Sequence, residues 1–365
     1  MTLRLLAILS CGLHHIDQQR VTVHSKMTNR ALRLGMLGTG TIARVHAQNL
    51  DQIPEARLVA VADVNSERAR ALAGSREATV VPDLDGLLRY GLDAVIVCLP
   101  PFATAGVVAR IAEADVHVYA EKPVGLSLEA ALNDLDAVRR AGVVAASGYM
   151  WRSSPLVRKA CELLDGRAVG LVQGAVITGA PPPVWWRDKA LSGGALVELG
   201  THIIDLMRLF GGEPRRVTCI GTRKLLEGAG CSIEDVAAAT VEFQAGGVGS
   251  FSLSCATSGG RWSMDVVACN LHLYLNFFPE ELSGNCDGLP ISYVPDATAN
   301  IVPHGFSGAA SWYSSLHKFV RAARAGDPKG VGASFEEGVR TLALTLALEE
   351  SLMAGGMPVD VERFA

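Results

Sequence analysis

The fold is decided by the stretch Leu32-Arg33-Leu34-Gly35-Met36-Leu37, which continues as Gly38-Thr39-Gly40-Thr41-Ile42-Ala43. The first six residues form a short apolar run that is typical of a buried parallel strand. The next six match the pattern G-x-G-x-x-A. In this pattern Gly38 permits a tight turn, Gly40 lets the backbone approach a pyrophosphate, and Ala43 lets a helix pack close to its strand. The helix N-terminus at Thr41 and Ile42 offers N–H groups and a partial positive charge to phosphates.

A carboxylate follows at the end of the next strand-like run. Asp63 closes the run Leu58-Val59-Ala60-Val61-Ala62 and stands twenty residues after Ala43, the offset expected for a carboxylate that binds the adenosine ribose hydroxyls. Arg68 lies one turn into the following helix, where it can soften the charge of Asp63. We therefore predict a site for NAD, with NADP as the alternative. The other interpretation is an ordinary βαβ unit with a glycine turn.

The composition narrows the class of protein. The 365 residues are too many for one typical core and suit two domains, and a hydrophobic content of 49% excludes general disorder. The net charge of −4 gives no reason to expect a nucleic-acid partner. The 8 cysteines form no C-x-x-C pair, so we expect reduced thiols in a cytoplasmic protein without a metal site.

Residues 1–30 are expected to be an extension outside the folded domains. Met1 to Cys11 resembles a weak signal peptide, but its apolar core is short and no small-x-small cleavage site follows. His14-His15 interrupts any membrane span. The favoured explanation is a misplaced start codon, with Met27 as the true start. A chain that begins at Met27 is expected to fold and to bind its cofactor.

Strands and helices alternate strictly from residue 31 to about residue 150. Strand-like runs after Asp63 cover Ala78–Val81, Asp93–Leu99, Val116–Ala120 and Val143–Ala146, with helical patterns between them. This alternation predicts a doubly wound parallel sheet of the Rossmann type. Ligands bind at the carboxyl edge of such a sheet. Four residues that end or follow two of these strands are therefore expected at the cofactor site: Leu99, Pro100, Glu121 and Lys122.

The pattern changes in residues 151–365, which we assign to a substrate and oligomerisation domain. Helices are expected over Pro155–Leu164, near residue 200, and over Trp312–Arg324 and Phe335–Met353, with a long loop over Asn285–Phe306. Strand-like runs cover Val169–Ile177, Arg216–Gly221, Val236–Gln244, Gly249–Cys255, Met264–Ala268 and Leu271–Phe277. The predicted class is α/β, with the Rossmann domain followed by an α+β domain whose open sheet is mostly antiparallel. We expect a homo-oligomer that forms through this sheet.

Three stretches resemble the glucose–fructose oxidoreductase and inositol dehydrogenase family (Gfo/Idh/MocA): Gly38–Ala43, Ala120-Glu121-Lys122-Pro123, and Ser192–Asp205, which reads SGGALVELGTHIID. The resemblance implies a Rossmann domain, an open-sheet domain, a cis Lys122–Pro123 bond, and NAD(P)-dependent chemistry at a secondary alcohol of a sugar or cyclitol. Three positions depart from the family pattern. Glu198 stands where Asp is common, Thr104 where His is common, and Ala114-Asp115-Val116 where Ala-Gly-Lys is common.

Lys122, Glu198 and His202 are the predicted catalytic residues. The cationic amine of Lys122 can bond to the reacting oxygen and favour its alkoxide character. Glu198, His202 and Asp205 have the spacing i, i+4, i+7, which places them on one helix face. His202 is the natural proton acceptor, and a carboxylate one turn away can orient its ring. A surface lysine and a capping histidine are the alternatives, and no third ligand suggests a metal.

A polyol pocket is predicted from side chains that stack on sugar rings or bond to hydroxyls: Trp151, Arg152, Trp186 and Arg187, together with Lys122 and His202. Core packing is the alternative for the first four. His304 is a weaker candidate, and His46 and His117 are interpreted as structural.

Taken together, these features predict an NAD(P)-dependent dehydrogenase of a sugar, inositol or related polyol, with no nucleic-acid or membrane partner. A non-catalytic dinucleotide-binding sugar sensor of the same fold is one alternative, although a sensor would need neither Lys122 nor His202. A reductase or dehydrogenase of a non-sugar carbonyl or dihydrodiol is the other.

Overall fold

The computed structural model describes residues 30–226, 230–296 and 309–364, and all of these from Ala31 onward belong to one compact unit. The predicted N-terminal extension, with its proposed start at Met27, lies outside the described residues apart from Arg30. Within the described ranges, no helix combines the length and the apolar character needed to cross a bilayer.

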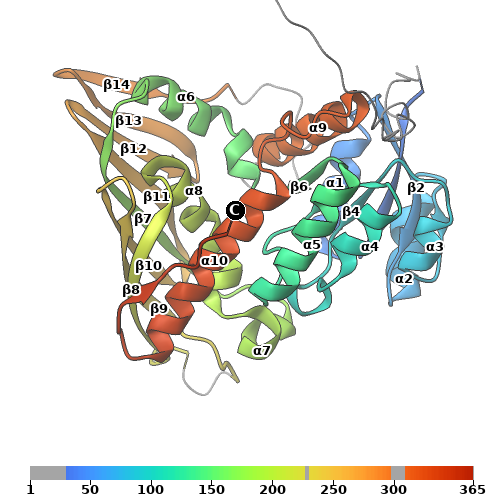
Figure 1. The fold of residues 1–365 in the computed structure, drawn as a ribbon, viewed down its shortest axis with the longest axis horizontal. Coiled ribbons are helices and arrows are strands. Elements are labelled where there is room, and N and C mark those ends of the chain that lie inside the picture. Colours follow the sequence, from blue (N-terminus) through green and yellow to red (C-terminus); the bar gives the residue numbers. More distant parts are fainter. Residues whose placement is uncertain (1–29, 227–229, 297–308, 365) are drawn as a thin grey trace, which may run out of the picture. The chain divides into compact units, whose positions relative to one another are not determined.

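The N-terminal half, at the right of Figure 1, contains a six-stranded sheet with the order β3-β2-β1-β4-β5-β6. All neighbouring strands in this sheet are parallel. Its strands are β1 (Leu32–Leu37), β2 (Ala56–Ala62), β3 (Thr79–Val80), β4 (Ala94–Val97), β5 (His117–Ala120) and β6 (Ala145–Ser147). The intervening helices are α1 (Thr41–Leu50), α2 (Ser66–Gly74), α3 (Leu84–Leu88), the 3₁₀ turn η1 (Pro101–Ala103), α4 (Val107–Glu113) and α5 (Leu128–Ala141). The predicted Rossmann sheet is confirmed.

The order of strands in this sheet reverses between β1 and β4. Open α/β sheets bind ligands outside the carboxyl ends of their strands at such a point. The chain segments that leave β1, β2, β4 and β5 therefore gather at one edge, and they carry Gly38, Asp63, Leu99 and Glu121.

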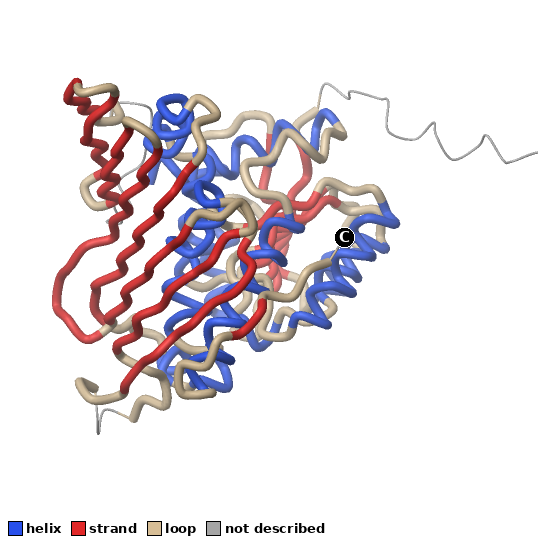
Figure 2. The backbone as a smooth tube through the Cα atoms, turned by 60° about the vertical axis from the view of Figure 1, so that its left-hand side comes forward, coloured by secondary structure: helices blue, strands red, loops and turns tan. Residues whose placement is uncertain are grey.

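The second half contains a nine-stranded sheet with the order β14-β13-β12-β11-β7-β10-β9-β8-β15. Its strands are β7 (Val169–Gly179), β8 (Pro214–Thr222), β9 (Val236–Phe243), β10 (Val248–Ser254), β11 (Ala256–Ala268), β12 (Leu271–Phe277), β13 (Glu280–Cys286), β14 (Leu289–Tyr293) and β15 (Val359–Asp360). Only β7 and β10 pair in parallel among these strands. Figure 2 shows the strands side by side, with helices gathered on one face. The predicted open, mostly antiparallel sheet is confirmed.

The helical elements of this half are η2 (Met150–Ser153), α6 (Pro155–Leu164), η3 (Val184–Arg187), α7 (Lys189–Ser192), the π-helical turn η4 (Leu196–Gly200) and α8 (Thr201–Gly211). Of these, α8 packs against β7, β10 and β11, and α6 packs against β12 and β13. Ile203, Leu206, Met207 and Phe210 of α8 are buried in the core beneath the sheet, as their spacing predicts.

The long loop predicted over Asn285–Phe306 is wrong in its first part. β13 and β14 pair there as an antiparallel hairpin. Their turn is Asp287-Gly288, with φ of +52° and +84°. A D-G pair is a strong hairpin signal because both central turn positions require positive φ. The rest of that predicted loop, residues 297–308, lies outside the described residues.

Two helices from the end of the chain, α9 (Ala309–Ala325) and α10 (Phe335–Met353), return to the parallel sheet (Figure 1). Leu316 and Phe319 of α9 lie in the same buried cluster as Met36 of β1. Phe335 and Val339 of α10 belong to the cluster formed by α4, α5 and the other face of the sheet. The last part of the chain therefore completes the core of the Rossmann domain, although it lies far beyond the predicted domain boundary at residue 150.

Candidate active site

A cavity of about 970 Å³ lies at the carboxyl edge of the parallel sheet and extends to the second domain. The Rossmann domain contributes Gly38, Gly40, Thr41, Ile42, Asp63, Arg68, Leu99, Pro100, Glu121 and Lys122 to its lining, among others. The second domain contributes Pro183, Val184, Trp185, Glu198 and His202, and α9 contributes Trp312. The structure thus brings together the three predicted catalytic residues and, except for Ala43, all the predicted cofactor residues.

The glycine-rich turn leaves space where a pyrophosphate would approach. Gly38 has φ +86°, and a Cβ there would lie 2.5 Å from the carbonyl oxygen of Cys98, so only glycine fits. A Cβ on Gly40, the N-cap of α1, would meet no atom within 4 Å. Ala43 is fully buried between helix and sheet, which is the packing role predicted for it. These features fit a dinucleotide at this edge.

Asp63 is held by donors around its carboxylate. Thr39 donates from its N–H at 2.6 Å and from its hydroxyl at 2.8 Å, Asn65 donates its N–H at 2.7 Å, and Arg68 donates from Nη2 at 2.9 Å. Burial alone would raise the pKa of Asp63, but the hydrogen bonds from Arg68, Asn65 and Thr39 outweigh it and lower the pKa to about 2. Asp63 is therefore a carboxylate at neutral pH, with Arg68 beside it.

Lys122 and Glu198 join the two domains across the cavity. The Lys122–Pro123 bond is cis. Lys122 Nζ donates to Glu198 Oε1 at 2.7 Å and to the Glu198 carbonyl oxygen at 2.9 Å. Trp186 Nε1 donates to the other carboxylate oxygen at 2.5 Å. Glu198 is therefore fixed at both oxygens, and its negative charge offsets the Lys122 ammonium.

His202 stands at the cavity wall one turn after Glu198. Its ring contacts Trp151, Trp262 and Tyr149, with centroid distances of 5.3, 6.0 and 6.3 Å. Burial and then the nearby Lys122 charge hold the pKa of His202 well below its usual value, so the imidazole is neutral. Among the described residues, no group bonds to the buried Nδ1. Nε2 is left as the nitrogen available to the cavity.

Neither carboxylate near His202 orients its ring, which corrects that part of the prediction. Both oxygens of Glu198 are engaged by Lys122 and Trp186. Asp205 instead accepts Arg152 Nε at 2.8 Å and Nη2 at 2.9 Å. Thr341 of α10 donates its hydroxyl to the same carboxylate at 2.7 Å. The π-turn Leu196–Gly200 contains Glu198 and changes its spacing relative to His202. Asp205 lies with His202 in the regular helix α8, and its carboxylate is taken up by Arg152 and Thr341.

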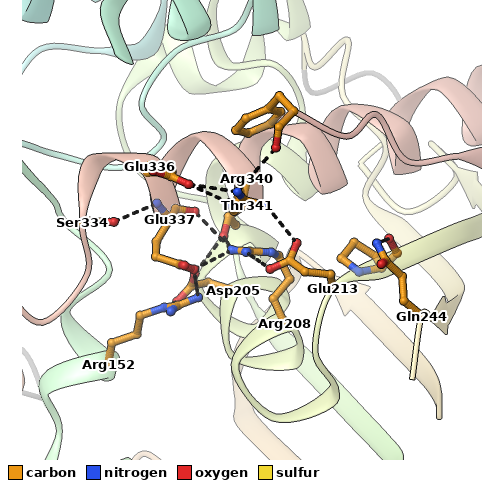
Figure 3. Close-up of polar contacts among 12 residues, drawn as sticks. Arg152, Asp205, Arg208, Glu213, Gln244, Ser334, Glu336, Glu337, Arg340 and Thr341 are labelled. Carbon is orange, nitrogen blue, oxygen red and sulfur yellow. Dashed lines mark hydrogen bonds and ion pairs between the residues drawn. The ribbon is translucent and has the colours of Figure 1, made fainter. Parts of the chain in front are cut away.

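Figure 3 shows that Asp205 belongs to an ion-pair network between α8 and α10. Arg208, which is 3% exposed, bonds to the Glu337 carboxylate at 3.1 Å and to Thr341 at 2.9 Å. Arg152 also pairs with Glu337, at 2.9 Å. The network anchors the helix that carries His202.

Of the six predicted polyol-binding residues, Lys122 and His202 line the cavity, whereas Trp151, Arg152, Trp186 and Arg187 do not. Trp151 is buried in the core and stacks on Phe277 at 4.3 Å. Trp186 is buried and supports Glu198, Arg152 lies in the network of Figure 3, and Arg187 is exposed outside the cavity. His304 lies outside the described residues.

The two histidines interpreted as structural lie outside the cavity lining, although the partner of His46 is the cavity residue Glu121. His46 is buried, and its Nε2 lies 2.7 Å from Glu121 Oε1. His117 accepts the Val144 N–H at 3.0 Å.

Sequence reasoning missed three aromatic residues in the cavity lining: Phe102, Trp185 and Trp312. Phe102 follows the Pro100-Pro101 pair at the end of β4, a position that the ligand-binding edge could have indicated. Trp185 and Trp186 are adjacent in sequence, and local pattern cannot decide which ring faces the cavity. Among the described residues, no group of three His, Cys, Asp or Glu side chains could hold a metal.

Two family models match the chain. Residues 32–149 match "Oxidoreductase family, NAD-binding Rossmann fold", and residues 157–271 match "GFO/IDH/MocA C-terminal domain". The uncharacterized oxidoreductase YrbE of Bacillus subtilis (strain 168) is 27% identical over 90% of this chain and 96% of its own length. Inositol 2-dehydrogenase of Rhizobium meliloti (strain 1021) is 35% identical over 51% of this chain and 57% of its own length. The solved structure of a levoglucosan dehydrogenase in complex with NADH and levoglucosan shares the fold, with a TM-score of 0.83 at 19% identity over 92% of this chain and 100% of that one.

Proposed function

The chain belongs to the Gfo/Idh/MocA family of NAD-binding oxidoreductases, and from this we propose that it oxidises or reduces a secondary alcohol of a sugar, inositol or related polyol. The observation that carries the proposal is the convergence of Lys122, Glu198 and His202 on one cavity with the glycine-rich turn. The names of the relatives, which include an inositol dehydrogenase, support this substrate class.

The three residues have separate roles in accepting the hydroxyl proton of the substrate and in stabilising the charge that develops on its oxygen. A bound nicotinamide supplies the hydride acceptor or donor. His202, neutral at working pH, accepts the hydroxyl proton of the substrate through Nε2 as the alcohol is oxidised. The Lys122 ammonium stabilises the oxygen as it becomes alkoxide-like. Glu198 holds the amine in place through the 2.7 Å bond.

Three alanine substitutions test these roles. A panel of sugars and polyols with NAD, followed by reduced-nicotinamide absorbance, first identifies a substrate. His202→Ala is then expected to lower kcat by about 10²–10⁴-fold while NAD affinity stays within a few-fold. Lys122→Ala should lower kcat at least as much, and Glu198→Ala less. A near-normal kcat in His202→Ala would move the role of base to Lys122.

Oligomerisation through the large sheet is a second part of the proposal. Residues along β10 alternate between buried side chains, which face the helices, and exposed or half-buried side chains, which lie on the outer face of the sheet. An open face of nine strands offers an extended surface to a second copy. Light scattering after gel filtration measures the mass, and a monomer at micromolar concentration would contradict this part.

A further inference from the structure

Three aromatic side chains and Val184 line the cavity, and we refer to Phe102, Val184, Trp185 and Trp312 as its aromatic wall. Phe102 lies in η1 at the end of β4, and Trp185 lies in η3 next to the tryptophan that bonds to Glu198. The rings of Phe102 and Trp185 meet edge to face, with centroids 6.4 Å apart. Trp312 packs against the core cluster that also holds Trp151. The wall and the three predicted catalytic residues therefore line the same cavity.

The charges that line the cavity are unfavourable for an anionic substrate. Its carboxylates are Asp63, Asp83, Glu121 and Glu198, while its only cations among the described residues are Arg68 and Lys122. Each cation already pairs with a carboxylate, Arg68 with Asp63 at 2.9 Å and Lys122 with Glu198 at 2.7 Å. A bound dinucleotide adds the negative charge of its pyrophosphate.

Neither Arg152 nor Arg187 offers its guanidinium group to a substrate at the aromatic wall. Arg152 is 9% exposed at its side chain and is bound to Asp205 and Glu337. Arg187 does not line the cavity. Residues 297–308 contain neither lysine nor arginine in their sequence. A phosphate or carboxylate on the substrate would therefore enter a negatively charged site in which the described residues offer it no unpaired cation.

We propose that the substrate is an uncharged cyclic polyol or sugar whose C–H face stacks on Trp185 with Phe102 at its side, and that phosphorylated or carboxylated derivatives are rejected. This inference rests on the proposed function and narrows its substrate class. Sugar and cyclitol rings carry hydroxyls at their edges and C–H groups on their faces. An aromatic wall takes such a face, while Lys122 and His202 bond to the edge. Hydroxyls that pointed at the wall would lose their hydrogen bonds, so O-methylation on that side is tolerated.

Matched substrate pairs test the charge. D-glucose against D-glucose 6-phosphate, and myo-inositol against myo-inositol 1-phosphate, are compared by kcat/KM with NAD and by calorimetric binding to the NADH-loaded protein. For a pair with activity, the neutral member is expected to be at least about 100-fold better in kcat/KM and to bind more tightly. Equal or better turnover or binding of the phosphorylated member would overturn the inference. If no compound is oxidised, the proposed function fails, and the binding comparison still decides the charge.

Substitutions at Trp185 test the wall. Trp185→Ala should raise KM for the best neutral substrate about tenfold or more while the Kd of NAD changes less than threefold. Trp185→Phe, the matched control, keeps an aromatic face and should restore most of the affinity. Trp185→Arg should reduce the discrimination against the phosphorylated member at least tenfold, because it supplies the missing cation. An unchanged KM in Trp185→Ala, or unchanged discrimination in Trp185→Arg, would contradict the assigned wall.

Discussion

The protonation state of His202 should be measurable as a pH-dependent loss of stability. Burial and the Lys122 charge hold the pKa of His202 well below the value of 6.5 that an unperturbed histidine has. The unfolded chain therefore binds a proton at His202 that the folded chain does not bind. The perturbation is a change from pH 7.5 to pH 5.5, applied to the wild type and to His202→Gln, which cannot take up this proton.

The size and the sign follow from linkage. Above pH 6.5 both states are neutral at this ring, so it contributes no pH dependence. Below pH 6.5 the unfolded state gains a proton and the folded state does not, so stability falls by about 1.4 kcal/mol for each pH unit until the lowered folded-state pKa is reached. At pH 5.5 the wild type should thus have lost about 1.4 kcal/mol of unfolding free energy that His202→Gln retains.

Urea unfolding followed by tryptophan fluorescence measures this difference. At each pH, the unfolding free energy of His202→Gln is subtracted from that of the wild type. The two differences, at pH 7.5 and at pH 5.5, are then compared. His272→Gln is the matched control, because it also removes one titratable imidazole, but from a half-exposed position. A wild-type-minus-variant difference that is the same at both pH values would refute a neutral, buried His202. The neutral base of the proposed mechanism would then have to be abandoned.

Three further predictions concern the cofactor, Glu198 and the network of Figure 3. NAD should bind more tightly than NADP because the Asp63 carboxylate repels a 2′-phosphate. In a fluorescence titration Asp63→Ala should lose most of this preference, and tighter NADP binding by the wild type would contradict the prediction. Trp186→Phe removes the 2.5 Å bond to Glu198 and should lower kcat by about tenfold or more at unchanged NAD affinity, since a hydrogen bond to a charged group contributes about 1.5–3 kcal/mol. Asp205→Ala leaves the buried Arg152 with less compensation and should cost about 3 kcal/mol in urea unfolding, whereas a loss below about 1 kcal/mol would show that Glu337 compensates alone.

The parts of the fold set by local pattern could be predicted from sequence. The glycine turn and each apolar strand are encoded by residues that are close in sequence, so the Rossmann sheet could be predicted from them. The Asp287-Gly288 turn carried a comparable local signal that was missed. The closing helix Phe335–Met353 has the bounds that its periodicity predicts.

The contacts that shape the site are long-range, and no local pattern encodes them. Lys122 and Glu198 are separated by 76 residues, and Asp205 and Thr341 by 136. The spacing of Glu198, His202 and Asp205 predicted one shared face, but each side chain has a different set of neighbours. The choice of Trp185 over Trp186 as a cavity residue is likewise made by the rest of the fold.

The return of α9 and α10 to the parallel sheet has a consequence for biosynthesis. β6 ends at Ser147, whereas the helices that complete the covering of both faces span 309–325 and 335–353. A ribosome that adds roughly 5–20 residues per second needs on the order of 10–40 s to make the intervening chain. During this interval the nascent sheet exposes the apolar surface that Leu316, Phe319 and Phe335 later cover. The half of the protein that is made first is therefore among the last to become fully buried, and a chain released near residue 150 should be a client of chaperones rather than a stable domain.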